Sequence, residues 1–553
     1  MTSQSDGART IAQQVVEAIR LADIDTLFCL PGVQNDDFFD ALVDARDIRP
    51  VVTRHEQGAA YMANGASLVA GRPAAFCVVP GPGLLNAGAA LTSGYWSNAR
   101  VLAVVGEIAT AVRGRGFGVL HELPDQHAIV GQLTKHAELL VHGPSATKQM
   151  QAALDALVSG RPRPVSLEIP VDRWRTPAPG ALRSPVATKP VIDPRAVERA
   201  TEALRRAERP LIVVGGGAQD AGEAIGRLAE RLQAPVTARR AGHGVIPTAH
   251  PMFVHLAVGH ELWKTADVVV GIGTRLEWPV LHWGTDASMT FVKIDIDAEE
   301  LDRHRLDAIG VCGDADDAVR ALLEALDGMP ARPDRSDEIA RRRARYLADI
   351  DHLRPQLDFL GAIRDVLPDD GIFVEDVTQI GFAAHLAFDF RRPRTFQSTG
   401  PAGTLGAGYA QGVGAQVALD REGRGRRALV AAGDGGFLFT GSELATAVQH
   451  RIPIVCCVFD DGAYGNVKRI QQQRFGEDRT IASTLRSPDF VAYARAFGAV
   501  GLHADGPAEL RARLDEAFRA DGPAVIHVST GPMPDPWPWF LFGRVRGERP
   551  RRS

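Results

Sequence analysis

The sequence has few of the features that mark a membrane, secreted or nucleic-acid-binding protein. It contains only 5 cysteines in 553 residues, and their positions match neither a disulfide framework nor a metal-ligand spacing. No apolar run approaches the length that spans a bilayer, and the opening residues MTSQSDGARTIAQQ include no apolar signal segment. The net charge of −5 gives no reason to expect nucleic acid or an anionic membrane as a partner. We therefore expect a cytoplasmic protein whose cysteines are reduced and buried.

What the sequence does contain is a repeated alternation of helical and strand-like segments. The pattern ARTIAQQVVEAIRL has helical spacing and is followed by the short apolar run IDTLFCL, and similar pairs recur along the chain. Such alternation predicts mostly parallel sheets that are covered by helices on both faces. A chain of this length exceeds one hydrophobic core, so we predict an α/β fold with three doubly wound parallel-sheet domains.

Proline-rich and charged stretches divide the chain into these domains. Two stretches that lack a strand pattern are interpreted as linkers, and the second of them, which is rich in charge, is expected to contain a surface helix. The predicted organisation is an N-terminal domain at 1–171, a linker at 172–196, a central domain at 197–328, a linker at 329–356, a C-terminal domain at 357–530 and a tail at 531–553.

The segment GDGG at 433–436 joins a predicted strand to the helical run SELATAVQH. Backbone N–H groups at the beginning of a helix are free to bind a phosphate. The carboxylate of Asp434 would repel that phosphate unless a divalent cation lay between them, and Mg²⁺ is commonly held by one or two carboxylates together with phosphate oxygens. The segment therefore predicts a site for Mg²⁺ and a phosphorylated ligand.

Two further acids follow the next predicted strand, IPIVCCVF. Asp461 stands 27 residues after Asp434, which is about one helix and one strand, so both carboxylates are expected at the ends of adjacent strands, where ligands bind in open α/β sheets. An ordinary explanation is also open, in which Asp434 caps a helix and the segment 460–462 only forms a turn. The combination of both segments at this spacing favours the metal site.

Together these segments resemble the thiamine diphosphate motif, GDG followed by NN, of enzymes such as acetolactate synthase and benzoylformate decarboxylase. The resemblance implies thiamine diphosphate and Mg²⁺ as cofactors, with the metal held by Asp434, Asp461 and the carbonyl of Ala463. This chain has two aspartates where the motif has two asparagines, a change that keeps the oxygen ligand. The residues around the acids that the resemblance assigns to cofactor binding are Gly433, Gly435, Gly436, Tyr464 and Gly465.

A carboxylate in the N-terminal domain extends the resemblance. In RHEQGAAYMANGASLVAG, Glu56 is similar to the family's glutamate that hydrogen-bonds the aminopyrimidine ring of the cofactor and promotes loss of the C2 proton. A glutamate in a first helical turn also has an ordinary explanation, its favourable interaction with the helix dipole. In QSTGPAGTLGAGYAQGVGAQ, Leu405 resembles the apolar support beneath the cofactor, and Gly403 resembles the residue whose carbonyl accepts from the 4′-amino group. Gln379 resembles a residue that contacts the diphosphate.

The resemblance covers nearly the whole chain, including the loop PGPGLLN at 80–86. In this family the glutamate domain of one subunit faces the diphosphate domain of another, which implies a homodimer at minimum and a homotetramer as the expected assembly. The implied substrate is a 2-oxo acid or a related small carbonyl compound. FAD, which acetolactate synthases hold in their middle domain, is an alternative that we do not favour, because the segment GTRLEW at 273–278 keeps only the arginine of the FAD-binding segment.

The residues expected around the reacting carbonyl differ more from those of acetolactate synthases than the cofactor-binding residues do. Gln34 lies in a loop that is more polar than in acetolactate synthases, and His121 and Glu122 fall where those enzymes carry a Phe-Gln pair. His121 is a candidate for proton transfer because an unperturbed histidine titrates near neutrality, and a surface histidine is the alternative. Gln34, His121 and Glu122 join Glu56 as candidate catalytic residues.

Three interpretations of function are open. The favoured one is a thiamine diphosphate-dependent decarboxylase or carboligase that acts on a 2-oxo acid. The second is a C–C lyase or hydrolase that uses the same cofactor on a diketone or a 2-hydroxyacyl thioester. The third, a cofactor-binding protein without catalysis, is disfavoured by Glu56, because a simple binding protein needs no proton relay.

The C-terminal segment GPMPDPWPWFLFGRVRGERPRRS combines alternating prolines with an aromatic cluster. The prolines exclude a regular helix and favour an extended strap, whereas the aromatic side chains must pack on another surface. We predict that this strap is a lid over the active site, and the alternative is a structural strap in a hydrophobic groove. The basic residues at its end are expected to be solvated.

Overall fold

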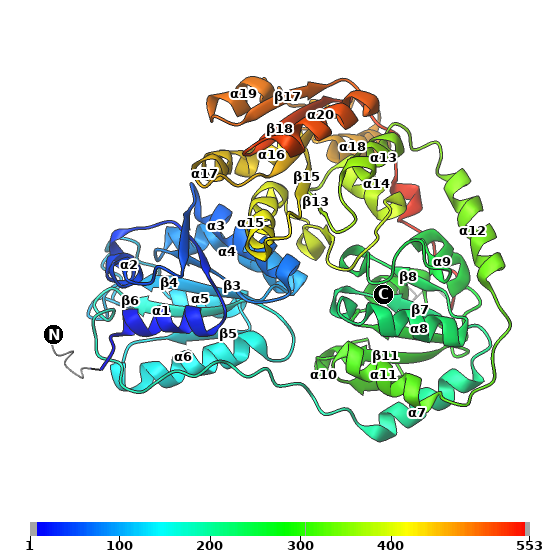
Figure 1. The fold of residues 1–553 in the computed structure, drawn as a ribbon, viewed down its shortest axis with the longest axis horizontal. Helices are drawn as coiled ribbons and strands as arrows, with labels where there is room; N and C mark the ends of the chain where they lie inside the picture. Colours follow the sequence, from blue (N-terminus) through cyan, green and yellow to red (C-terminus); the bar gives the residue numbers. More distant parts are fainter. Residues whose placement is uncertain (1–7, 305, 548–553) are drawn as a thin grey trace.

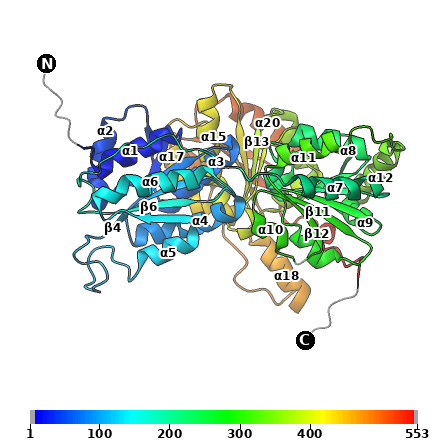
Figure 2. The same ribbon diagram turned by 90° about the horizontal axis from the view of Figure 1, so that it is seen from below.

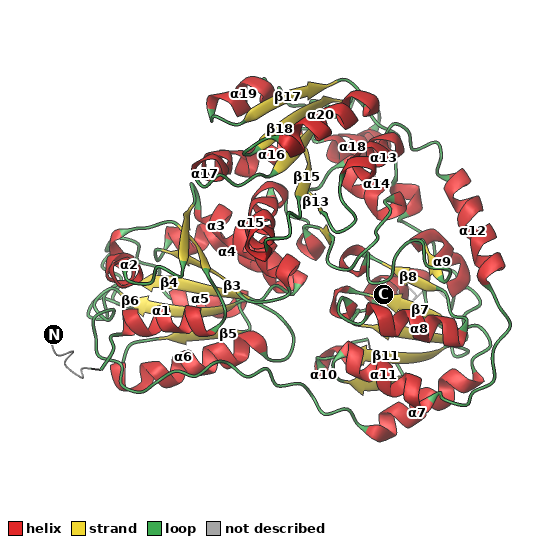
Figure 3. Ribbon diagram, viewed as in Figure 1, coloured by secondary structure: helices red, strands yellow, loops and turns green. Residues whose placement is uncertain are grey.

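Three six-stranded sheets, all built from parallel strands, form the framework of the protein. The computed structural model describes residues 8–304 and 306–547, and Figure 1 shows the three units in chain order, the first in blue to cyan, the second mostly in green and the third in yellow to red. Helices cover the strands in every unit (Figure 3). The predicted fold class is therefore confirmed.

The N-terminal unit has the strand order β2-β1-β3-β4-β6-β5. Its strands are β1 (Thr26–Cys29), β2 (Arg49–Val52), β3 (Ala74–Val78), β4 (Val101–Glu107), β5 (His136–Leu139) and β6 (Val165–Pro170). Its helices are α1 (Ile11–Leu21), α2 (Asp36–Val43), α3 (Glu56–Ala70), α4 (Pro82–Ser97), α5 (Gln126–Leu133) and α6 (Gly143–Val158). Because the strands are parallel, the loops that follow β1, β2 and β3 lie at one edge of the sheet.

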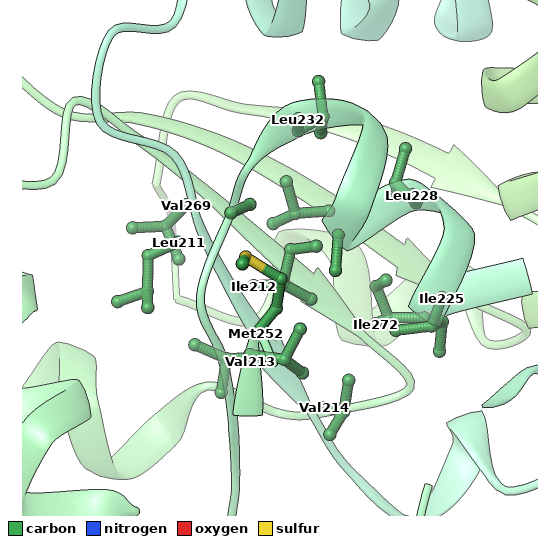
Figure 4. Packing of buried hydrophobic residues seen from close by; sticks show 14 of the residues in the cluster. Leu211, Ile212, Val213, Val214, Ile225, Leu228, Leu232, Met252, Val269 and Ile272 are labelled. Atoms are coloured by element: carbon green, nitrogen blue, oxygen red, sulfur yellow. The ribbon is translucent and has the colours of Figure 1, made fainter. Parts of the chain in front are cut away.

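The central unit has the strand order β12-β11-β10-β7-β8-β9. Its strands are β7 (Leu211–Val214), β8 (Val236–Ala238), β9 (Phe253–Val254), β10 (Val268–Ile272), β11 (Thr290–Asp295) and β12 (Ala308–Cys312). Its helices are α7 (Pro194–Arg206), α8 (Gly222–Leu232), α9 (Leu256–Trp263), α10 (Ala298–Asp302) and α11 (Ala315–Ala325). Figure 4 shows why β7 is a continuous apolar run: its side chains pack among those of α8 and β10, on a strand covered on both faces.

The C-terminal unit has the strand order β14-β13-β15-β16-β18-β17. Its strands are β13 (Ile372–Glu375), β14 (Phe396–Gln397), β15 (Ala428–Gly433), β16 (Val455–Asp460), β17 (Val500–Ala504) and β18 (Ala524–Ser529). Its helices are α13 (Gln356–Val366), α14 (Gln379–Ala387), α15 (Ala407–Glu422), α16 (Asp434–Thr440), α17 (Leu444–Gln449), α18 (Gly465–Phe475), α19 (Phe490–Ala496) and α20 (Pro507–Arg519). Counted in chain order, its strands follow the same sequence as those of the N-terminal unit, whereas the central unit has the order of dinucleotide-binding folds.

The N-terminal and C-terminal units share one hydrophobic core. Helices α3 and α15 cross at its centre, and they lie side by side in Figure 1. Two glycines allow this close crossing, because a Cβ at Gly65 would lie 2.0 Å from the Gln411 carbonyl oxygen and a Cβ at Gly414 would lie 1.9 Å from the Met62 carbonyl oxygen. The main chains of the two units therefore come into direct contact.

The two predicted linkers behave differently. The second contains the expected surface helix, α12 (Ser336–Asp349), on the outside of the molecule. The beginning of the first belongs to the N-terminal core, because Trp174 is fully buried and its indole N–H donates to the Gln34 carbonyl oxygen at 2.8 Å. Ala178 is also buried there. Aromatic burial anchors a stretch whose prolines had suggested only a linker.

The C-terminal tail crosses to the central unit. Instead of a wholly extended strap it contains one short 3₁₀ turn, Trp537–Trp539, and no α-helix in its described part. Its apolar side chains pack against the core of the central unit: Trp539, Phe540, Phe542 and Val545. The prediction that these aromatics pack on another surface is confirmed.

The basic end of the tail is only partly described. Residues 548–553 lie outside the described residues, but the Arg546 side chain is buried against the central unit. It pairs with Asp286 at 3.1 Å and donates to the Ala266 carbonyl oxygen at 2.7 Å. At this position the expectation of a solvated basic tail is wrong, because backbone carbonyls and an aspartate offer the guanidinium better partners than water alone.

The expected burial of the cysteines is confirmed at four of the five positions. All five are free; four are buried and Cys312 is partly exposed. Burial raises the pKa of Cys29 to about 12, so this thiol is not an activated nucleophile. Within the described residues, none of the helices has the length and apolar character needed to cross a bilayer.

Candidate active site

The acidic residues predicted from the two motif segments lie side by side. Strand β15 ends at Gly433 and pairs with β16, which ends at Asp460. Asp434 begins α16 directly after β15, and Asp461 directly follows β16. The parallel register therefore places all three carboxylates at one edge of the C-terminal sheet, as the spacing predicted.

These carboxylates stand close enough to perturb one another. Burial, together with the charges of Asp460 and Asp461, raises the pKa of Asp434 to about 6. Burial also raises the pKa of Asp461. A divalent cation between Asp434 and Asp461 would relieve both the repulsion and the loss of hydration. The residues present therefore fit a hard cation that prefers oxygen ligands.

Two polar side chains that the sequence interpretation missed complete this edge. The Ser487 hydroxyl lies 3.1 Å from the Asp434 carboxylate and 2.8 Å from that of Asp460, and it can donate to one of them at a time. The ring of His527 lies 3.2 Å from the other oxygen of Asp460. The partners of Asp460 are thus protein groups, and this leaves Asp461 as the freer carboxylate for a metal.

Glycines allow the chain to pack closely around the acids. A Cβ at Gly435 would lie 2.6 Å from the Tyr464 ring, and a Cβ at Gly465 would lie 2.3 Å from a carboxylate oxygen of Asp461. At Gly436 a Cβ would lie 3.0 Å from a carboxylate oxygen of Asp376. Side chains at these positions would displace the residues that shape the site, so glycine is required for this close packing around the carboxylates.

The remaining residues assigned to the cofactor lie in neighbouring segments. Gly403 adopts φ 59°, in the left-handed region that favours glycine, and Leu405 is half-buried two residues later. Gln379 begins α14, and its buried side-chain oxygen has no hydrogen-bond partner in the described part of the chain. An unpartnered amide at the start of a helix fits a polar ligand at this edge.

Glu56 begins α3, at the end of β2. Its carboxylate is half-buried and accepts a hydrogen bond from the side-chain amide of Asn86 at 3.0 Å. Asn86 is the last residue of the segment PGPGLLN, which resembles a loop of the family. That resemblance does not predict the contact between Asn86 and Glu56. The ring of His55 lies 3.9 Å from the same carboxylate oxygen. Glu56 is therefore oriented by the beginning of α4.

His121, one of the predicted substrate residues, lies against the loop that leads into α4, whereas Gln34 lies in the short 3₁₀ turn Val33–Asn35 after β1. A Cβ at Gly81 would lie 2.3 Å from the main-chain oxygen of His121, and a Cβ at Gly83 would lie 3.6 Å from a Glu56 oxygen. His121 Nδ1 is buried without a hydrogen-bond partner among the described residues, and the side-chain oxygen of Gln34 has none there either. Each side chain thus has a buried polar atom without a protein partner, and its role in binding substrate remains a prediction.

Glu122 has a different environment. Its carboxylate accepts hydrogen bonds from the backbone amides of Gly116 and Val119, each at 3.0 Å. These contacts hold the loop between β4 and α5. Its catalytic role remains a prediction, and the geometry indicates that the carboxylate is used to shape its own loop.

Among the described residues, His, Cys, Asp and Glu form no group of three or more with the arrangement of a metal cage. A cavity of about 480 Å³ lies elsewhere, between α3 and the end of α15, and is lined mainly by arginines.

The fold and these residues define a class of protein: an α/β enzyme built from three parallel-sheet units, with a glycine-flanked acidic edge in its last unit. Models of the N-terminal TPP binding domain, the central domain and the C-terminal TPP binding domain of thiamine pyrophosphate enzymes match residues 9–129, 197–322 and 376–528. The chain belongs to the thiamine pyrophosphate enzyme family. The matched segments lie within the three predicted domains, whose boundaries remain predictions.

Two relatives illustrate the range of the family. The chain is 32% identical to a probable 2-ketoarginine decarboxylase, AruI, of Pseudomonas aeruginosa, with 94% of each chain covered. It is 30% identical to the acetolactate synthase isozyme 2 large subunit of Escherichia coli, with 97% of this chain and 98% of that one covered. The predicted thiamine diphosphate enzyme similar to acetolactate synthase is confirmed.

Proposed function

We propose that this chain is a thiamine diphosphate- and Mg²⁺-dependent decarboxylase or carboligase that acts on a 2-oxo acid. The observation that carries the proposal is the set of three carboxylates at the ends of β15 and β16, beside the glycines at the beginning of α16. When bound, the cofactor supplies a nucleophilic carbon that attacks the substrate carbonyl and takes up the electrons released as CO₂ leaves. The protein must bind this cofactor, orient it and move protons around it.

Each residue has a proposed role in that work. Asp434, Asp461 and the carbonyl of Ala463 hold Mg²⁺, because hard oxygen ligands suit this ion and the carboxylates otherwise repel each other. Glu56 accepts a proton from, or returns it to, the aminopyrimidine ring, and Asn86 keeps its carboxylate in place. The amides around Gly435 bind the diphosphate.

The substrate side of the site is proposed to lie beside His121 and Gln34. Their unpartnered polar atoms can hydrogen-bond a carboxylate or carbonyl oxygen of a 2-oxo acid. The names of the two relatives suggest two reactions to test, decarboxylation of 2-ketoarginine and synthesis of acetolactate. A diketone or a 2-hydroxyacyl thioester remains the alternative.

The metal and cofactor roles are tested by retention of thiamine diphosphate after gel filtration. We expect the purified protein to retain the cofactor with Mg²⁺ and to lose it when a chelator removes the ion. Asp434→Ala should not retain it, whereas Asp420→Ala, at the end of α15, should behave like wild type. Full retention by Asp434→Ala would overturn the proposed metal site.

The reaction is tested with a panel of substrates. Protein loaded with cofactor is incubated with pyruvate, with 2-ketoarginine, with a diketone and with a 2-hydroxyacyl thioester, and CO₂ and products are measured. Release of CO₂ from a 2-oxo acid, with an aldehyde or a ligated hydroxyketone as product, is the expected result. Cleavage of the diketone or thioester without CO₂ release from either 2-oxo acid would overturn the proposal.

We further propose a cytoplasmic homodimer or homotetramer in which Glu56 of one copy serves the metal site of another. Apolar side chains beside both half-sites support this arrangement, because Leu85, Leu438 and Phe439 are 44–51% exposed in the single chain. Mixing Glu56→Gln with Asp434→Ala protein tests it. Random exchange of subunits should restore roughly one quarter of wild-type activity, because hybrid dimers have one intact site. Activity no higher than in the separate variants would contradict a shared site.

We propose that the central unit does not require FAD. Its two glycine loops bond to each other at the point where strand order reverses, since the Gly217 amide donates to the Gly273 carbonyl oxygen at 3.1 Å. The Arg239 guanidinium lies 4.2 Å from the centre of the Trp278 ring nearby. The visible absorbance of the purified protein, and turnover with and without added FAD, test this proposal.

A further inference from the structure

A buried glutamate of the C-terminal unit contacts the segment that carries Glu56. Glu443 ends the short 3₁₀ turn Gly441–Glu443 between α16 and α17, and it is fully buried. Its partners lie 388 and 389 residues away in the sequence, at the end of β2 and just before α3. Within one chain, the contact therefore joins the unit that carries Glu56 to the unit that carries Asp434 and Asp461.

The carboxylate of Glu443 is satisfied by main-chain and hydroxyl donors. The Arg54 amide donates to both carboxylate oxygens at 3.1 Å, and the His55 amide donates to one of them at 3.0 Å. The Thr446 hydroxyl donates at 2.6 Å. Hydrogen bonds to a buried carboxylate are among the stronger ones in proteins, since a charged acceptor in a poorly solvated place depends on them.

The contact also depends on the absence of a side chain in α3. A Cβ at Gly58 would lie 2.1 Å from a carboxylate oxygen of Glu443. Gly58 is inside the helix, where glycine is less favourable than alanine by about 1 kcal/mol. Its presence there allows the carboxylate to reach the beginning of α3.

We propose that Glu443 is a positioning residue for Glu56. It holds the amides of the two residues before Glu56, so the direction in which the Glu56 side chain leaves the backbone is set by a carboxylate of the C-terminal unit. Asn86 orients the carboxylate of the same side chain. The two contacts together fix the backbone from which the Glu56 side chain leaves and the position of its carboxylate. The inference rests on the proposed role of Glu56 in proton transfer.

The first test needs no cofactor. Amide hydrogen exchange, followed by mass spectrometry, is measured on peptides that cover residues 52–60 in wild type, Glu443→Gln and Glu443→Ala. Loss of the carboxylate should speed exchange at Arg54 and His55 by at least about 10-fold, the equivalent of one charge-assisted hydrogen bond of about 1.4 kcal/mol or more. Exchange at the wild-type rate would overturn the proposal.

The second test uses protein loaded with thiamine diphosphate. Hydrogen–deuterium exchange at C2 of the bound cofactor should slow by roughly 10- to 100-fold in Glu443→Gln, because a misplacement of about 1 Å can cost about 100-fold. Cofactor affinity should change much less. Glu443→Asp, which keeps the charge but shortens the side chain, should fall between Glu443→Gln and wild type.

Two controls separate positioning from general stability. Glu300→Gln removes another buried carboxylate, one that pairs Arg161 of the N-terminal unit with the central unit. It should lower the melting temperature and leave C2 exchange unchanged. Gly58→Ala should displace Glu443 and slow C2 exchange although it improves helix propensity, whereas Gly361→Ala in α13, where a Cβ meets nothing within 4 Å, should have no effect on C2 exchange.

The outcomes distinguish this inference from the proposed function. Unchanged C2 exchange in Glu56→Gln, measured alongside, would refute the role of Glu56 itself. Slow exchange in Glu56→Gln together with wild-type exchange in both Glu443→Gln and Gly58→Ala would refute only the role of Glu443. Equal slowing in Glu300→Gln would also overturn it, because the effect would then follow from lost stability.

Discussion

The carboxylate of Asp376 is buried away from water, where a negative charge is poorly solvated. It is fully buried just after β13, and its partners are the backbone amides of Val377 at 2.8 Å and Gly406 at 3.0 Å. Burial raises its pKa to about 6, and the charge of Glu375 adds to the effect, while the amides oppose it. The residue holds together the loops around Gly406 and Gly436 at a cost in stability near neutral pH.

Asp376→Asn should therefore stabilise the cofactor-free protein at neutral pH. The folded-state pKa of about 6 exceeds the ordinary value of 3.8, so the stability associated with this group is complete below pH 3.8 and is lost as the pH rises through 6. The amide variant should gain up to about 3 kcal/mol at pH 7 and little near pH 4. Melting temperatures measured from pH 4 to 8 check this.

Asp47→Asn provides a control of opposite sign. A hydrogen bond from Arg20 lowers the pKa of Asp47 to about 2, so its contribution is present above the ordinary pKa and is lost as the pH falls toward 2. Removing that charge should not raise the melting temperature at pH 7. A lower melting temperature of Asp376→Asn than of wild type at pH 7 would show that the amide bonds outweigh the cost of burial.

At the scale of elements, the tail joins two surfaces. Its first part lies against α18 and α14, where Trp537 donates to Asn466 at 2.7 Å and its ring lies 5.0 Å from that of Phe382. Its second part lies on the central unit, where Phe542 stacks on His260 with ring centres 4.6 Å apart. Helix α18, which projects from the molecule in Figure 2, follows directly after Asp461 and Tyr464.

We therefore expect the first part of the tail to affect turnover and the second part to affect stability, and variants of each part test this. Phe542→Ala should lower the melting temperature by the equivalent of about 1–2 kcal/mol, because a half-buried ring loses its packing, with turnover per folded site unchanged. Trp537→Ala should lower turnover, or release intermediates as side products, because α18 loses an anchor beside the metal site.

Truncation after Thr530 should combine both effects in a protein that still binds cofactor. Normal turnover per folded site in the truncated protein and in Trp537→Ala would contradict the lid and leave a structural strap.

At the scale of the whole molecule, Arg394 connects all three units. It follows the end of α14 in the chain, and its guanidinium pairs with Asp220 of the central unit at 2.6 Å and lies 3.4 Å from the Leu68 carbonyl oxygen of α3. Its φ of 58° is rare for a residue with a side chain. It also lines the arginine-rich cavity, together with Arg72 and Arg421, which both pair with Asp23.

Arg394→Ala should loosen the junction between the units. We expect a fall in stability of about 1–3 kcal/mol, since hydrogen bonds to charged groups at a partly buried site are lost. The melting temperature of the variant should also depend less steeply on salt than that of wild type, because salt screens the ion pair that the variant lacks. Arg391→Ala removes a guanidinium that pairs with Asp369 and Asp389 of its own unit and should change the melting temperature less. Equal effects would show that Arg394 does not act between units.

Much of the fold and one half of the site could be predicted from the sequence, because the signals are local or repeat with a fixed period. Apolar runs and helical periodicity identify most strands, but short or less apolar strands escape this signal: β5, β8, β9, β12, β14 and β17. The acids after β15 and β16 could be placed together, since the ends of adjacent parallel strands always meet at one edge. The Glu56 helix was found by its position after a strand.

The sequence by itself thus determined the class of fold, the acidic edge and the family resemblance. Only the tertiary structure decided that Asn86 orients Glu56, that Ser487 lies between Asp434 and Asp460, and that the tail packs on the central unit. These contacts join residues that are tens to hundreds of positions apart. They depend on which helices approach closely enough for a given side chain to reach, and that choice is made by the packing of whole units, for which no local pattern in the chain carries a signal.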